Sequence, residues 1–181
     1  VFAALCHDLG KPSVTEEDAS GDVVAPEHGA AGVKPTSVFL VAISMPKTMK
    51  QHIVPLVREH IAHFSEDLTV SAVMRLAYRL MPTNIRVWEM LTQADAAGCP
   101  PLPVCRPAQD WLGLAERIDV GHQKAKPIIT GKLLMAWGVP SSPRMGRMLE
   151  GAYQAQMDAQ FSDEKSAHSW VNKYHIATDG N

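Results

Sequence analysis

The chain has 181 residues, of which 46% are hydrophobic and 20% charged, and its formal net charge is −2 at pH 7. This length fits one domain, or one domain with a small appendage, and it is long enough to bury a core without disulfides or structural metals. The small net charge excludes a global attraction to nucleic acid. No run of about 18 apolar residues occurs, so we expect no membrane span. Cys6, Cys99 and Cys105 form no CxxC pair, which favours a reducing, cytoplasmic location.

Apolar residues follow a helical period along almost the whole chain, and no period-2 alternation of useful length occurs. The pattern therefore predicts an all-α fold. The run at 1–6 already reads as the middle of a buried helix, so we expect the chain to be part of a longer protein. After a surface loop at 13–23, we expect helices at about 25–45 with a kink at Pro35, 46–64, 69–81, 82–97, 107–126, 130–137, 143–160 and 163–174.

A stiff segment divides the expected helices into two groups. The sequence CPPLPVC at 99–105 cannot be helical, because its prolines lack the backbone N–H and restrict the residues before them. We therefore expect a helical domain at 1–98, a Pro-rich linker at 99–106 and a C-terminal helical region at 107–181.

A histidine stands beside an aspartate at the end of the first expected helix, in the sequence CHDLGKP of residues 6–12. Neighbouring helical side chains point about 100° apart, but Gly10 and Pro12 end the helix here, so His7 and Asp8 can face one partner. An imidazole and a carboxylate together suit a divalent ion such as manganese, iron, nickel, zinc or magnesium. Taken alone, the dipeptide favours the alternative, a capping aspartate beside a half-buried histidine.

Histidines in the expected helix 46–64 differ in the face that they occupy. With Ile53 as the reference and 100° per residue, His60 lies about 20° away, in the middle of the apolar face. His63 lies about 80° away, near the edge of that face, and His52 lies further round. His60 is therefore the better candidate ligand. A core histidine bonded to a backbone carbonyl explains its position equally well.

Asp95 shares a helix face with the apolar Trp88 and Leu91. An aspartate on an apolar face is costly unless a cation pairs with it, and no Arg or Lys stands on that face. We therefore expect a buried Asp95 that binds a metal. His28 stands in the first turn of its helix before GAAG, whose small side chains let another element approach closely. An exposed histidine at a helix N-terminus is the alternative.

The motifs together resemble one family. The order His7–Asp8, His28 in EHGAAG, His60, and Asp95 in QADAAG is similar to the HD superfamily of metal-dependent phosphohydrolases. LCHDLGK followed by EHGAAGV most resembles the HD domain of bacterial tRNA nucleotidyltransferases, the CCA-adding and poly(A) polymerase family. The stretches KPIITGKLLMAWG and SPRMGRML are similar to that family's tail. The resemblance implies an all-α HD-domain helical bundle with a small C-terminal helical appendage.

The resemblance also implies residue roles. The doublet and the final aspartate of the family bind metal, and the additional histidines bind a second ion or contact phosphate. Lys11 matches the lysine after the doublet, where a cation can neutralise a substrate phosphate. The implied metal ligands are His7, Asp8, His28, His60 and Asp95, and the implied catalytic residues are Asp8, Lys11, His28 and His60.

The implied reaction is phosphoester hydrolysis by a metal-activated water, acting on 2′,3′-cyclic nucleotides or RNA 3′-end phosphates. Two features of the family are missing from this sequence. Its first metal-binding histidine stands before the doublet, so we expect impaired activity here. The nucleotidyltransferase head, with its strand-borne carboxylates and Gly-Ser phosphate loop, is also missing. We expect no nucleotidyltransferase activity from this segment, and such a head N-terminal to it in the full-length protein.

Basic charge gathers between residues 122 and 149, where no acidic residue occurs. Ser142 and Pro143 can start a helix with a hydroxyl cap, and such a helix N-terminus can hold a phosphate of a tRNA backbone. The alternative is a solvated helix hairpin that packs its Leu, Met and Trp residues. The candidate RNA-binding residues are Lys124, Lys126, Lys132, Arg144 and Arg147.

Two other functions stay open at this point. A non-catalytic helical body that holds tRNA for a nucleotidyltransferase would bind tRNA with a steep salt dependence, unaffected by Asp95→Ala. An HD nucleotidase acting on free nucleotides would hydrolyse mononucleotides without affinity for RNA.

Overall fold

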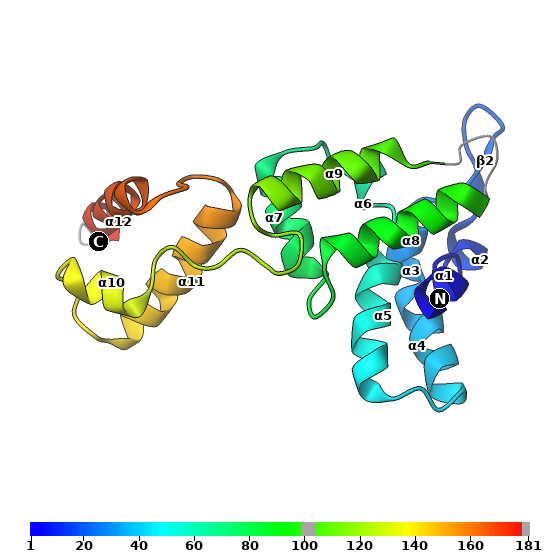
Figure 1. Cartoon of the computed structure of the whole chain (residues 1–181), viewed down its shortest axis with the longest axis horizontal. Helices are drawn as coiled ribbons and strands as arrows, with labels where there is room; N and C mark the ends of the chain where they lie inside the picture. The colour runs from blue at the N-terminus through cyan, green and yellow to red at the C-terminus, as the bar shows by residue number, and fades with distance from the viewer. Residues whose placement is uncertain (99–103, 179–181) are drawn as a thin grey trace. The chain divides into compact units, whose positions relative to one another are not determined.

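Helices make up nearly all the regular structure, as the apolar pattern predicts, and the all-α prediction is confirmed. The computed structural model describes residues 1–98 and 104–178, with side chains up to residue 173 (Figure 1). The one sheet in these residues pairs β1 (Glu16–Glu17) with β2 (Val23–Val24) in an antiparallel hairpin that spans most of the expected surface loop and ends one residue beyond it. No helix among the described residues is both long and apolar enough to cross a membrane.

The chain divides into two compact units, Val1–Lys124 and Ala125–Asn181. The first unit contains α1 (Phe2–Cys6), α2 (Lys11–Val14), α3 (His28–Ala31), α4 (Val33–Ala42), α5 (Lys47–Glu59), α6 (Ala62–Ser65), α7 (Val70–Arg79), α8 (Ile85–Gly98) and α9 (Arg106–Arg117). The second unit contains α10 (Gly131–Ala136), α11 (Pro143–Met157) and α12 (Glu164–Thr178).

The division between units differs from the expected domain boundary. We expected the C-terminal region to begin at 107, but α9 packs against α7 and α8 and belongs to the first unit. Residues 99–103 of the expected linker lie outside the described residues. The expected helix 107–126 ends at Arg117, and the chain then turns through Asp119, whose φ is 57°.

Two other expected helices are broken in the structure. The helix at 25–45 is interrupted at Gly32 and not at Pro35, because Pro35 lies in the first turn of α4, where the missing N–H has no helical partner to lose. The helix at 46–64 ends at Glu59, and α6 follows as a separate turn. Phe64 continues the apolar spacing of the expected helix, but because the helix ends before it, its side chain is 77% exposed.

The core of the first unit surrounds α5, which contacts α1, α3, α4, α7 and α8. Ile53, Leu56 and Val57 are buried on its inner face, as their spacing predicts. Trp88 and Trp111 are also buried, and their ring centroids lie 6.0 Å apart between α8 and α9. This arrangement places the C-terminal end of α5 among the other helices.

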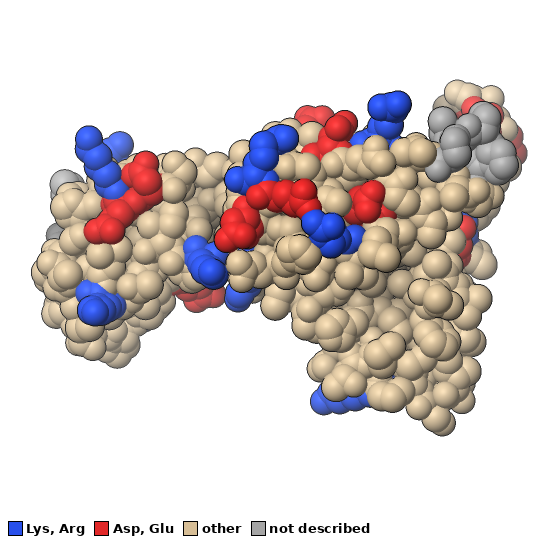
Figure 2. All heavy atoms as spheres, viewed as in Figure 1, with Lys and Arg blue, Asp and Glu red and all other residues tan. Residues whose placement is uncertain are grey.

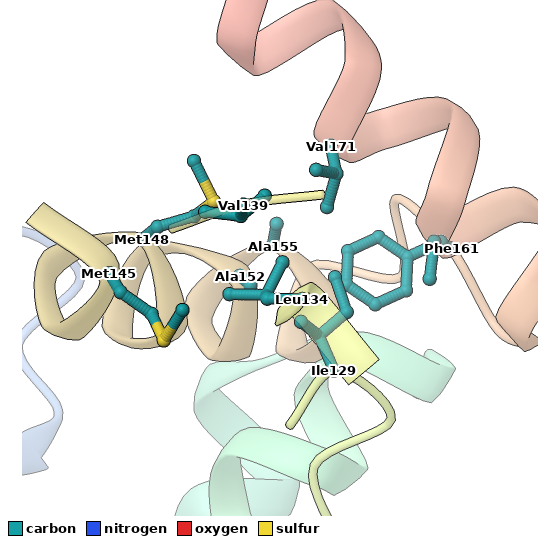
Figure 3. Packing of buried hydrophobic residues seen from close by; sticks show 10 residues of the cluster. Ile129, Leu134, Val139, Met145, Met148, Ala152, Ala155, Phe161 and Val171 are labelled. Atoms are coloured by element: carbon teal, nitrogen blue, oxygen red, sulfur yellow. The ribbon is translucent and has the colours of Figure 1, made fainter. Parts of the chain in front are cut away.

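The second unit has its own core. Side chains from α10, α11 and α12 point toward one another (Figure 3). The Gln156 side chain ties the incoming chain to α11, since its Oε1 accepts from the Ile128 N–H at 2.8 Å and its Nε2 donates to the Lys126 carbonyl at 2.8 Å. The buried members of this core are Ile129, Leu134, Val139, Met145, Met148, Ala152, Ala155, Phe161, Ala167 and Val171.

Candidate metal centre

Glycines bring the backbones around the candidate site into direct contact. A Cβ built on Gly29 would lie 2.5 Å from the Arg58 carbonyl oxygen, so α3 approaches α5 as closely as only glycine permits. A Cβ on Gly10 would overlap the His28 carbonyl oxygen and lie 2.5 Å from the Gly32 nitrogen. The small residues after His28 therefore allow the close approach that the sequence suggested, and they place His28 beside the end of α5.

Three histidines reach the site, each with its Nδ1 bonded to a backbone carbonyl three residues earlier. The Nδ1–O distances are 2.8 Å from His7 to Ala4, 2.8 Å from His28 to Ala25 and 2.7 Å from His60 to Val57. Because a carbonyl oxygen can only accept, these bonds assign the proton of each neutral ring to Nδ1. Each Nε2 therefore carries a lone pair, which is the state of a metal-ligating imidazole.

The Asp8 carboxylate lies between two groups of these side chains. On one side, Asp8, His28 and His60 place one ligand atom each within 4.8 Å of one another, with His28 Nε2 3.5 Å from Asp8 Oδ1. On the other side, His7 Nε2 lies 3.4 Å from Asp8 Oδ2 and 3.2 Å from Asp95 Oδ1. All five expected metal ligands thus come together from separate parts of the first unit.

The contacts within the cluster fit a bound cation. His28 Nε2 and His60 Nε2 lie 3.0 Å apart, although both carry lone pairs in the assigned tautomers. Two ligand atoms that each lie about 2.1 Å from one cation, at an angle of about 90°, are about 3.0 Å from each other. Asp8 Oδ1 is buried and has no hydrogen-bond donor among the described residues. A divalent ion held by His28, His60 and Asp8 would satisfy the two nitrogens and this oxygen, which are costly to bury without a partner.

Burial and neighbouring charges favour the protonation states of His60 and Asp8 that can bind a metal. Burial lowers the pKa of His60 to about 4, partly opposed by the Val57 carbonyl, so its ring is neutral at pH 7. Partial burial alone would raise the pKa of Asp8, but the hydrogen bond from Lys11 and the positive charge of that lysine lower the pKa below its ordinary value. Lys11 Nζ lies 2.7 Å from Asp8 Oδ2. Asp8 is therefore ionised at neutral pH.

Asp95 differs from the expectation in its burial. Trp88 and Leu91 on the same face of α8 are buried, but the Asp95 side chain is 45% exposed. The last turns of α8 extend past the core, so Asp95 shares the helix face of Trp88 and Leu91 without sharing their burial. The prediction of a buried Asp95 was therefore wrong. What supports Asp95 as a ligand is its contact with His7.

The cluster opens onto a cavity of about 1090 Å³, whose polar side includes Asp8, Lys11, His28 and Asp95. A smaller recess of about 350 Å³ adjoins His7, Asp8 and Asp95. The ligand group is thus reachable by a small molecule on the side where Lys11 lies.

Sequence reasoning did not assign several other residues of this cavity to the site. His63 was placed at the edge of the apolar face, but its Nε2 lies 3.4 Å from Cys105 Sγ and its ring packs edge-on against Trp88, with centroids 5.7 Å apart. Phe64 and Arg106 line the same cavity. The spacing of His60 and His63 could have suggested a common site, but no sequence signal links either to residue 105.

The candidate RNA-binding residues are divided between the two units. Lys124 belongs to the first unit, where its Nζ lies 5.5 Å from the centroid of the Tyr78 ring. The other four are exposed in the second unit. The expected hydroxyl cap is wrong, since Ser142 begins α11 without a side-chain hydrogen bond. Acidic and basic side chains both occur on the visible face of each unit (Figure 2).

Comparisons of the chain with protein-family models, with curated proteins and with solved structures found no match.

Proposed function

We propose that this chain is an HD-type, metal-dependent phosphohydrolase domain of a tRNA nucleotidyltransferase-like protein. The observation that carries the proposal is the convergence of three Nε2 lone pairs and two carboxylates beside an open cavity, with Lys11 at its edge. Such a mixed set of imidazole and carboxylate ligands suits divalent manganese, iron, nickel, zinc or magnesium.

When bound, a divalent cation supplies Lewis acidity at a phosphoryl oxygen and a water of lowered pKa. The chain's own residues have separate tasks. Asp8 offers one oxygen to each side of the cluster, and the carbonyl bonds of the histidines fix the direction of their lone pairs. Lys11 carries positive charge at the cavity, where it stabilises the charge on a phosphoester as the bond to the leaving group breaks.

The substrates that we propose are 2′,3′-cyclic nucleotides and RNA 3′-end phosphates. Their phosphate is at the end of the molecule, where it can enter a cavity and reach Asp8 and His28 on its polar side. The test is a phosphoesterase assay of the chain with each of the five metals, on adenosine 2′,3′-cyclic phosphate and on an RNA oligonucleotide with a 3′-phosphate.

The decisive variant is Asp8→Asn, which keeps the side-chain shape and removes the charge. We expect it to lower hydrolysis about a hundredfold or more, because it weakens both sides of the cluster. The matched control is His52→Gln, on the exposed face of α5, which should retain full activity. Hydrolysis that is equal in Asp8→Asn and in the unsubstituted chain would overturn the proposal, as would no hydrolysis with any of the metals.

A further inference from the structure

The cavity beside the ligand cluster has an apolar part in addition to its polar one. The residues that form it come from the loop before α3, from α6 and its N-cap, and from the start of α9 and the segment before it. They are Pro26, Ile61, Phe64, Val104 and Pro107. A phosphate group alone would fill only the polar part, so the apolar part indicates that the ligand carries a further, uncharged group.

Phe64 is 77% exposed, compared with 44% for Val104 in the same apolar part. Its ring lies against the ring of His63, with centroids 4.0 Å apart and planes inclined by 42°. An exposed phenylalanine gains free energy when a flat apolar group covers it. The ring therefore presents a stacking surface inside the cavity.

The His63 ring, against which Phe64 packs, is held in place by its contacts with the core. His63 packs edge-on against the buried Trp88, and its Nε2 lies 3.4 Å from Cys105 Sγ. Phe64 thus rests on a residue that is anchored on both α8 and the segment leading into α9. Such a backed ring keeps its orientation, which a stacking platform requires.

Positive charge also lines the cavity, from Lys11 and from Arg106 in the first turn of α9. A ligand that satisfies all these groups has a phosphate, a flat apolar ring system and a size suited to the space. Ligand pockets commonly enclose about 300–1,000 Å³, and this cavity of about 1090 Å³ has room for a nucleotide.

We infer that Phe64, backed by His63, determines specificity by stacking on the base of a nucleoside phosphate ester whose phosphate lies at Asp8 and Lys11. This inference rests on the proposed function and adds to it the residue that selects the substrate. A free nucleotide and the 3′-terminal nucleotide of an RNA share this chemistry.

The test compares two cyclic phosphodiesters that differ in the base: adenosine 2′,3′-cyclic phosphate and ethylene glycol cyclic phosphate. Stacking of one base on an aromatic side chain corresponds to about 5- to 150-fold in affinity. We expect Phe64→Ala to lower kcat/KM by such a factor for the adenosine ester and to leave the glycol ester unchanged. Phe64→Trp should restore the preference.

The control is Met49→Ala, which removes an exposed apolar side chain that does not line this cavity and should change neither rate. Comparing the mononucleotide with an RNA that ends in a 2′,3′-cyclic phosphate shows whether the stacked base belongs to a free nucleotide or to an RNA end. Turnover of either substrate that depends on Phe64 supports the inference. An active enzyme in which Phe64→Ala alters both esters equally, or neither, would overturn it.

A second measurement separates this inference from the proposed function. If neither ester is hydrolysed, the proposed function fails, but the stacking surface can still be tested by equilibrium dialysis of adenosine monophosphate against ribose 5-phosphate. Tighter binding of the adenosine compound that is lost in Phe64→Ala supports the inference. Equal affinity for the two compounds overturns it.

Discussion

Replacing Gly29 by alanine tests how the fold positions the metal centre. The new Cβ would lie 2.5 Å from the Arg58 carbonyl oxygen and 3.2 Å from that of Val57. Ordinary contact begins at about 3.4 Å, so α3 must move away from α5 by about 0.9 Å. Both obstacles are backbone atoms, which cannot rotate aside. Since His28 directly precedes Gly29, its ring moves with α3.

The expected effect on stability is that of overpacking, a loss of about 1–3 kcal/mol. The effect on metal affinity follows from the separation of His28 Nε2 and His60 Nε2, which is 3.0 Å in the unsubstituted chain. Misplacing a ligand through its supporting structure typically costs about 10- to 100-fold in metal affinity. Urea unfolding in the presence of EDTA measures the first effect, and calorimetric titration with Mn²⁺ or Zn²⁺ measures the second.

Gly113→Ala is the matched control. Gly113 lies within α9, and a Cβ there meets only the end of the Arg117 side chain, at 3.9 Å. Because alanine is the better helix former, this variant should gain about 0.5–1 kcal/mol and bind metal normally. Unchanged stability in Gly29→Ala would refute the close contact of α3 with α5. Lower stability with unchanged metal affinity would refute the claim that this contact positions His28.

Three further predictions concern the stability of the first unit. Burial holds the pKa of His60 at about 4, below its ordinary value of 6.5. Between these pH values the unfolded chain binds more protons than the folded chain does. The free energy of unfolding of the metal-free protein should therefore fall by about 3 kcal/mol from pH 6.5 to pH 4. Urea titrations should show this loss much reduced in His60→Gln, and an equal loss in both proteins would contradict the assignment. Arg79→Met removes the guanidinium that lies 2.8 Å from the buried Glu59 carboxylate, and it should lower the free energy of unfolding by about 1–3 kcal/mol. Adding Glu59→Gln should recover part of this loss. No recovery would argue against the ion pair. Thr69→Ala deletes the hydroxyl that accepts from the Ala72 N–H at the start of α7 and should cost about 1 kcal/mol in thermal unfolding, while Thr69→Ser should stay close to the unsubstituted chain.

The sequence was informative where local chemistry decides the structure. Helical periodicity predicted that His60 continues the buried face of α5, and as the C-cap residue of that helix it is 2% exposed. Glycine and proline after the doublet predicted the end of α1, and α1 does end just before His7. The small residues after His28 predicted a close approach that the contact between Gly29 and α5 confirms. Each inference needed only the geometry of one helix.

The sequence was less informative where burial depends on distant parts of the chain. Asp95 continues an apolar stripe, but the end of α8 extends beyond the core and the side chain is exposed. Phe64 follows the helical period of α5, yet the helix ends at Glu59 and the ring faces the cavity. The contact of His63 with Cys105 joins residues 42 positions apart, and no local pattern encodes it.

Elemental analysis can show whether Asp8 and its neighbouring histidines hold a divalent metal. The chain, Asp8→Asn and His52→Gln would be stripped with EDTA, dialysed against manganese, iron, nickel, zinc and magnesium, and washed before analysis. We predict at least one bound divalent ion per chain in the unsubstituted protein and in His52→Gln, and its loss in Asp8→Asn. No bound metal in the unsubstituted protein, or equal metal in all three proteins, would rule out a metal centre at Asp8.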